Sequence, residues 1–131
     1  MIDGKAPIRI FMTPLPLTVS AGTALSDARD LMAAKQIRHL PVVDSGRIVG
    51  IVSARDVLVV EDLSVFASYD TTVEAAMAAN PVTVPTDTPV GHVVQTMATK
   101  DIGAVLVIDG GELKGIFTDV DAVKLLARVL S

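Results

Sequence analysis

The chain contains an internal repeat. Residues 12–57 align with residues 77–122 at a constant offset of 65 positions without a gap, and 15 of the 46 aligned pairs are identical. Each copy is small for a core of its own, so we expect the two copies to pack together about a pseudo-twofold axis. The repeat therefore predicts one compact module made of two related halves.

Hydrophobic periodicity predicts the same order of elements in both copies: strand, helix, strand, strand, helix. Short β-prone segments come first, apolar residues at helical spacing follow, and two apolar runs around an Asp/Gly turn then predict a hairpin. This order indicates an α+β protein, whose two β-α-β-β-α repeats pack through their sheets. The expected elements are strands at 17–19 and 82–84, helices at 25–32 and 90–97, hairpins at 40–52 and 104–117, and closing helices from Ala54 to about Asp62 and from Asp119 to about Val129.

The repeat also predicts how the chain is divided. We expect a lead-in at residues 1–10, a first repeat at 11–62, a linker at 63–75 and a second repeat at 76–131. The structure of the lead-in is left open by its sequence.

Composition excludes several classes of protein. The chain has no cysteine and two histidines, which argues against disulfides, thiolate nucleophiles and metal centres. Four aromatic residues and a pI near 4.9 argue against nucleic-acid binding. No apolar run approaches the roughly 20 residues of a membrane-spanning helix, and no secretory signal is visible. We therefore expect a cytoplasmic protein without a membrane or nucleic-acid partner.

One motif recurs where a strand leads into a helix. Residues 50–56 and 115–121 both carry glycine first, a hydroxyl residue fourth and aspartate seventh. A hydroxyl followed three residues later by an acid can be a capping box, although that motif prefers Glu or Gln and both copies use the shorter Asp. The glycine leaves uncovered backbone on the strand. A helix N-terminus can bind phosphate, and a nearby carboxylate can accept the hydroxyl protons of a ribose.

These motifs resemble those of a known family. Met12-Thr13-Pro14, the segment 37–44, the junction at 50–56 and their second-copy partners together resemble a tandem pair of cystathionine-β-synthase (CBS) domains, a Bateman module, over residues 10–126. The resemblance implies binding of an adenosine nucleotide in clefts between the repeats. In the family the ligand is usually AMP, ADP or ATP, and sometimes NAD or S-adenosylmethionine, so the resemblance implies AMP or ATP as the most favoured ligand here. Such modules regulate enzymes, transporters and channels and pair into homodimers.

The resemblance also assigns roles to individual residues. Asp56 and Asp121 would bind ribose hydroxyls, and Ser53 and Thr118 would contact ribose or phosphate. The remaining nucleotide-binding positions are Val19 and Val84 beside the adenine; Ile37, Pro41, Ile102 and Leu106 as apolar lining; and Arg38, His39 and Arg55 as phosphate contacts. His39 and Arg55 also have simpler interpretations, as a packed and a solvated residue. Neither catalytic nor metal-binding residues are expected.

The two copies differ in charge. Residues 1–66 carry seven basic and seven acidic side chains, whereas residues 67–131 carry four and eight. Three basic or titratable residues of the first copy, Arg38, His39 and Arg55, correspond to Gly103, Ala104 and Val120 in the second. The second copy also has Asp119 where the first has Ala54. Repulsion from Asp119 disfavours a polyphosphate there. We therefore expect one stronger site, or one site that prefers a less charged ligand.

Three functional hypotheses follow. The first is a non-catalytic sensor that binds an adenosine nucleotide and signals metabolic state to an unidentified regulated protein. The second is a ligand-independent dimerisation scaffold, which the apolar content supports equally well. The third, an enzyme, is disfavoured because Asp119 and Asp121 lie too close together to act as separated acid and base. No catalytic cofactor is expected.

Overall fold

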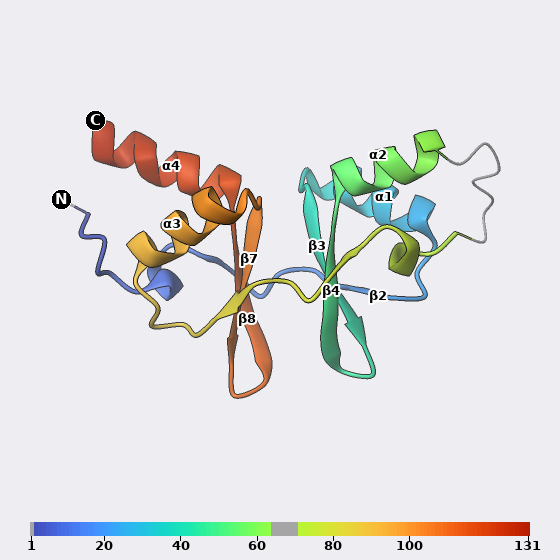
Figure 1. The fold of residues 1–131 in the computed structure, drawn as a ribbon, viewed down its shortest axis with the longest axis horizontal. Coiled ribbons are helices and arrows are strands. Elements are labelled where there is room, and N and C mark those ends of the chain that lie inside the picture. The colour runs from blue at the N-terminus through green and yellow to red at the C-terminus, as the bar shows by residue number, and fades with distance from the viewer. Residues whose placement is uncertain (1, 64–70) are drawn as a thin grey trace. The chain divides into compact units, whose positions relative to one another are not determined.

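The computed structural model describes residues 2–63 and 71–131, so residues 64–70 of the linker expected at 63–75 lie outside the described part of the chain. Within it, the chain forms four α-helices and two four-stranded sheets, as expected for an α+β protein (Figure 1). The chain divides into two compact units. Unit 1 contains residues 1–16 and 82–131, and unit 2 contains residues 17–81.

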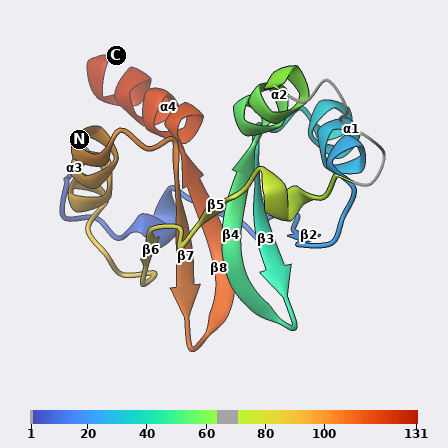
Figure 2. The same ribbon diagram turned by 45° about the vertical axis from the view of Figure 1, so that its right-hand side comes forward.

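Unit 2 is built on the β3–β4 hairpin. The elements are β2 (Val19–Ser20), α1 (Leu25–Lys35), β3 (His39–Asp44), β4 (Arg47–Ser53), α2 (Ala54–Leu63), a 3-10 turn at Val73–Ala75 and β5 (Ala78–Ala79). The strand order is β2-β3-β4-β5, with β2 parallel to β3 and the other pairs antiparallel. Helices α1 and α2 cover one face of the sheet, and Figure 2 shows β2 and β5 on either edge of the hairpin.

Unit 1 repeats this architecture. The elements are a 3-10 turn at Ile8–Ile10, β1 (Thr13–Pro14), β6 (Thr83–Val84), α3 (Val90–Lys100), β7 (Ala104–Asp109), β8 (Glu112–Thr118) and α4 (Asp119–Leu130). The strand order is β1-β8-β7-β6. The expected order of strand, helix, strand, strand, helix is thus confirmed in both repeats.

Each unit takes its outer strand from the first residues of the other sequence repeat. Strand β1 pairs antiparallel with β8 of the second repeat, and β5 pairs with β4 of the first. The lead-in also caps α3, because the Val90 and Gly91 amides donate to the Ala6 and Gly4 carbonyls, both at 2.8 Å. The compact units therefore differ from the sequence repeats, and the lead-in is an integral part of unit 1.

Local chemistry explains the turns and helix ends. In the Asp44–Arg47 turn, Ser45 and Gly46 have φ of 51° and 78°, and the equivalent glycines of the second copy have 58° and 77°. Positive φ at both central residues is the signature of the type I′ turn that suits a twisted hairpin. Helices α1 and α3 are each followed by a C-cap residue, Gln36 and Asp101, in the left-handed conformation at φ 53°.

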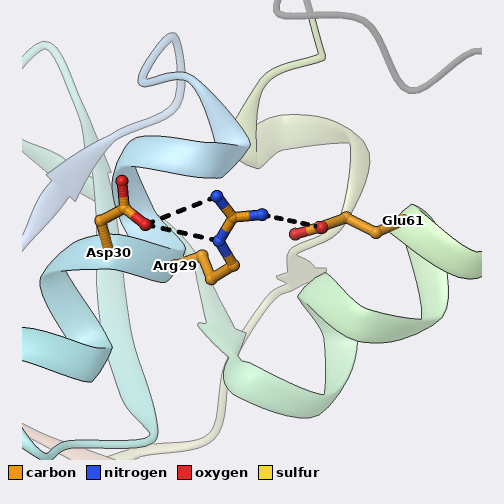
Figure 3. A network of polar contacts seen from close by, with 3 residues as sticks. All are labelled: Arg29, Asp30 and Glu61. Carbon is orange, nitrogen blue, oxygen red and sulfur yellow. Dashed lines mark hydrogen bonds and ion pairs between the residues drawn. The ribbon is translucent and has the colours of Figure 1, made fainter.

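The core of each unit lies between its sheet and its two helices. In unit 2, Leu40, Val42 and Val52 from the hairpin pack against residues of both helices, including Met32 and Val57. An ion pair also joins the helices, because Arg29 Nη1 on α1 lies 2.9 Å from Glu61 Oε2 on α2 (Figure 3). Glu61 thereby raises the pKa of the Arg29 guanidinium. The positions equivalent to this pair in unit 1 are Val94 and Leu126.

Candidate functional site

Both strand-to-helix junctions are closed by reciprocal hydrogen bonds. In unit 2, the Asp56 amide donates to Ser53 Oγ at 3.0 Å, and the Ser53 amide donates to Asp56 Oδ2 at 2.9 Å. In unit 1, the Asp121 amide donates to Thr118 Oγ1 at 3.3 Å, and the Thr118 amide donates to Asp121 Oδ2 at 2.9 Å. Each arrangement is a capping box, a motif whose hydroxyl contributes about 1 kcal/mol.

The use of the shorter Asp in place of Glu or Gln therefore does not distinguish these junctions from capping boxes. Thr118 has φ −109° and ψ 171°, an extended conformation that turns its own amide toward the first turn of α4. The short Asp121 side chain can then reach that amide with one carboxylate oxygen. Capping and ligand binding remain compatible, because a carboxylate offers about four acceptor positions and the box uses few of them.

Gly50 and Gly115, the first residues of the two junction motifs, are covered by neighbouring chain. A Cβ added to Gly50 would lie 2.6 Å from Met77 Sδ and 2.8 Å from the Ala78 carbonyl oxygen. A Cβ on Gly115 would lie 2.9 Å from the Thr13 carbonyl oxygen and would also collide with Met12. The expectation that these glycines leave uncovered backbone is thus wrong, because β5 and β1 pack directly on them.

The first junction gathers five of the predicted residues. Strand register places His39 opposite Ser53, and the Ala54 amide at the start of α2 donates to the Arg38 carbonyl at 2.9 Å. His39 is half-buried and takes part in an interaction, whereas Arg38 and Arg55 are exposed. Together with the half-buried Asp56, these side chains lie where the open end of the hairpin meets the helix.

The second junction has the same backbone arrangement and a different set of side chains. Ala104 lies opposite Thr118, and the Asp119 amide donates to the Gly103 carbonyl at 2.9 Å. Asp121 is half-buried, and Asp119 is exposed. The second junction therefore lacks the basic or titratable side chains of the first, because Gly103, Ala104 and Val120 occupy the equivalent positions.

The remaining predicted residues divide between two faces of the sheets. Pro41 pairs with Ile51 and Leu106 with Ile116, and strand alternation places them on the face opposite the helices, which His39 and Ser53 share. Val19 and Val84 belong to the cores beside the helices, as do Ile37 and Ile102. Val19 is 8% exposed, so contact between this residue and a ligand falls mainly to its backbone.

The sequence analysis did not predict that Met12 and Met77 pack beside the junction glycines. Met12 and Met77 pack over Gly115 and Gly50 and so help to fix the strands that lead into the junctions. Both are half-buried and occupy equivalent positions of the repeat. Their identity at the 65-residue offset was the available signal.

The described part of the chain shows neither a cluster of metal-ligating side chains nor a membrane-spanning helix. Residues 2–63 and 71–131 contain no group of three His, Cys, Asp or Glu side chains able to hold a metal ion. None of the helices described there is long and apolar enough to cross a membrane.

The chain is similar to proteins that contain CBS domains. L-aspartate semialdehyde sulfurtransferase of Methanocaldococcus jannaschii is 30% identical over 126 residues, which cover 92% of this chain and 24% of that protein. This chain spans less than half the length of two further curated relatives, 49% and 46%. The similarity to these larger proteins therefore concerns one portion of each.

Two solved structures share both the fold and detectable sequence identity. The CBS domain pair of protein MJ0100, in complex with 5′-methylthioadenosine and S-adenosyl-L-methionine, is 28% identical with a TM-score of 0.82 and covers 95% of this chain and 98% of that one. CBSX2 in complex with AMP is 26% identical with a TM-score of 0.80 and covers 96% of this chain and 99% of that one. The family model for the CBS domain matches residues 8–62 and 73–128, so the chain belongs to the CBS domain family and carries two CBS domains.

Proposed function

We propose that this chain is a non-catalytic regulatory module that binds an adenosine nucleotide, AMP or ATP, at its strand-to-helix junctions and signals metabolic state to a partner protein. Similar CBS pairs were solved with AMP and with 5′-methylthioadenosine and S-adenosyl-L-methionine, and all three ligands contain an adenosine group. A site that recognises this shared group needs acceptors for the ribose hydroxyls and a surface for the base.

The arrangement at Asp56 is the observation that carries the proposal. Its Oδ2 accepts the Ser53 amide, while Oδ1 makes no hydrogen bond to any residue that the structure describes. Both oxygens retain acceptor capacity, as a ribose diol requires. Arg55 precedes Asp56 in the sequence, and the Arg38 carbonyl accepts the amide that begins α2; both arginines are exposed, so this junction can supply positive charge for a phosphate, which guanidinium groups bind well.

The same geometry argues against catalysis at the second junction. The Asp121 carboxylate accepts hydrogen bonds from the Thr118 amide and hydroxyl, and Asp119 accepts one from the Val120 amide at 2.9 Å. Both acids thus accept hydrogen bonds at the start of one helix, rather than facing each other across a space where a substrate could bind. A general acid and base need access to the reacting group from suitable directions.

A binding panel tests the proposal directly. The melting temperature of the purified chain is measured with AMP, ADP, ATP, NAD, S-adenosylmethionine and 5′-methylthioadenosine, and again for the variant Asp56→Asn. Asparagine keeps one carbonyl oxygen for the cap but loses the charge and one acceptor. At 100 times its Kd, a ligand stabilises the folded state by about 2.7 kcal/mol, which raises the melting temperature measurably.

The matched control is Asp27→Asn, an equivalent change in the first turn of α1. We expect a nucleotide-dependent shift in the wild type and in Asp27→Asn, and a much smaller shift in Asp56→Asn. If no adenosine compound stabilises the wild type, the proposed function is wrong. If the shift survives in Asp56→Asn, the ligand binds elsewhere.

A second candidate function is a homodimerisation scaffold that needs no ligand. The last helix, α4, buries none of its residues, and Val123, Leu126 and Leu130 are 64%, 54% and 76% exposed. Their spacing places them along one side of the helix. Sedimentation equilibrium of the wild type and Leu126→Asp, each with and without nucleotide, separates the two functions. The scaffold requires a ligand-independent dimer that Leu126→Asp dissociates.

A further inference from the structure

The two junctions differ most at the residue that begins each helix. Ala54 begins α2, and its counterpart Asp119 begins α4. The next position is Arg55 in the first repeat and Val120 in the second. Over this pair of positions, the change from Ala-Arg to Asp-Val replaces one positive charge with one negative charge.

Asp119 also changes the hydrogen bonding of the helix N-terminus. At α4, the first three amides donate to the Gly103 carbonyl, to Asp119 Oδ1 and to Thr118 Oγ1. At α2, the first amide donates to the Arg38 carbonyl and the third to Ser53 Oγ. The second amide, that of Arg55, donates to no acceptor among the residues that the structure describes.

These differences determine what each junction can offer to a phosphate. At the first junction, a phosphate oxygen can accept a hydrogen bond from the Arg55 amide, and the junction carries two exposed arginines, Arg38 and Arg55. At the second junction, the corresponding amide is already bonded to the Asp119 carboxylate, and the first turn of the helix carries two acidic residues, Asp119 and Asp121. A phosphate there would have to displace Asp119 while remaining near its charge, and like charges disfavour such binding.

The ribose-binding features are retained at both junctions. Asp121 holds the Thr118 amide at 2.9 Å, as Asp56 holds the Ser53 amide at 2.9 Å. The difference between the junctions therefore concerns the phosphate and leaves the adenosine group acceptable to both.

Given the proposed function, on which this step rests, we infer that Asp119 is a specificity-determining residue that restricts the second junction to phosphate-free adenosine compounds. Phosphorylated nucleotides then bind at the first junction. The chain could thus bind two chemical classes of adenosine compound at the same time, one at each junction.

Isothermal titration calorimetry with AMP and adenosine tests this inference, because the two probes differ only in the phosphate. In the wild type we expect AMP to bind with one site per chain and adenosine with two. Asp119→Asn keeps a carbonyl oxygen for the Val120 amide and removes the charge. We expect this variant to bind AMP at a second site at least tenfold more tightly than the wild type does, while its affinity for adenosine changes less than threefold.

The reciprocal variant is Ala54→Asp, which copies the second junction into the first. It should weaken AMP binding at least tenfold, about 1.4 kcal/mol, and change adenosine binding less than threefold. Asp87→Asn, an exposed acid elsewhere in unit 1, controls for net charge and should leave both ligands unaffected. Asp121→Asn should abolish one adenosine site and leave the AMP site, which assigns the sites.

The possible outcomes separate the inference from the proposed function. If neither AMP nor adenosine binds, the proposed function fails and the inference fails with it. If AMP binds equally to two sites in the wild type, or if Asp119→Asn leaves AMP stoichiometry and affinity unchanged, the adenosine sites stand but the role of Asp119 is wrong.

Discussion

Replacing Gly50 with alanine should destabilise unit 2 by overpacking. The new Cβ would lie 2.6 Å from Met77 Sδ and 2.8 Å from the Ala78 carbonyl oxygen. The methionine side chain can move, but the carbonyl belongs to β5, whose residues Ala78 and Ala79 pair with β4. Relief of the clash therefore requires movement of a paired strand.

The expected loss follows from two opposing effects. Overpacking in a well-packed region costs about 1–3 kcal/mol. Loss of glycine flexibility in the unfolded chain returns about 0.4–1 kcal/mol. The net destabilisation is about 1–2 kcal/mol, and each kcal/mol lowers Tm by about 2–8 °C in a domain of this size range. Differential scanning calorimetry and urea unfolding can both measure a change of this size.

Gly22→Ala is the matched control, because an added Cβ there meets no atom within 4 Å. It should leave the free energy of unfolding unchanged or raise it slightly. Adding Met77→Ala to Gly50→Ala should restore only part of the loss, since the Ala78 carbonyl remains. The packing argument is refuted if Gly50→Ala is as stable as Gly22→Ala.

Three further perturbations test individual interactions. Thr118→Ala should lower the free energy of unfolding by about 1 kcal/mol in urea denaturation, because it removes the side-chain cap of α4. Glu61→Gln should lower the unfolding midpoint by less than Thr118→Ala, with a difference from wild type that shrinks in 1 M NaCl, because it removes a partly exposed ion pair. The Lys114 ammonium beside Glu112 lowers the pKa of that carboxyl below its ordinary value of 4.5. The pair therefore stabilises the fold at pH 7, and this stabilisation is lost as the pH falls through the lowered pKa. Glu112→Gln should therefore be slightly less stable than wild type at pH 7 and match it near pH 2, as thermal unfolding at both pH values would show.

Each of these predictions has a control and a contradicting result. Thr99→Ala, an exposed change within α3, should have a smaller effect than Thr118→Ala, and equal effects would argue against the cap. A salt-independent loss in Glu61→Gln would show that the charge is unimportant. A constant difference between wild type and Glu112→Gln from pH 7 to pH 2 would contradict the pKa argument.

Much of the fold was predictable because strong local signals coincide with the repeat. The hairpin at Asp44–Arg47 follows from a Ser-Gly turn between apolar runs, and the second copy repeats it with two glycines. The helices follow from apolar spacing. These elements are set mainly by residues near one another in the sequence.

The edge strands were not predictable from local sequence. Thr13–Pro14 and Ala78–Ala79 are two-residue strands whose side chains are exposed, and neither pair has the alternation or bulk typical of a strand. Their pairing depends on the distant glycines Gly115 and Gly50, which allow close approach. Contacts of this kind become visible only in three dimensions.

The candidate site was predictable in residue identity but incompletely in geometry. The repeat identifies Asp56 and Asp121, whereas the extended conformation that lets aspartate complete a capping box depends on the strand before it. The hydrogen bond from the Val120 amide to Asp119 likewise requires atomic positions. Charge differences between the junctions could be inferred from sequence, and their effect on backbone donors could not.

Nucleotide binding at the first junction is tested by titrating the ¹⁵N-labelled chain with AMP and recording ¹H–¹⁵N correlation spectra. We expect the largest chemical-shift changes at the amides of residues 53–56, with Arg55 prominent because its amide is available to a phosphate oxygen. Much smaller changes are expected at residues 118–121. Absence of shifts, or shifts centred on the exposed face of α4 with residues 53–56 unaffected, would contradict nucleotide binding at the first junction.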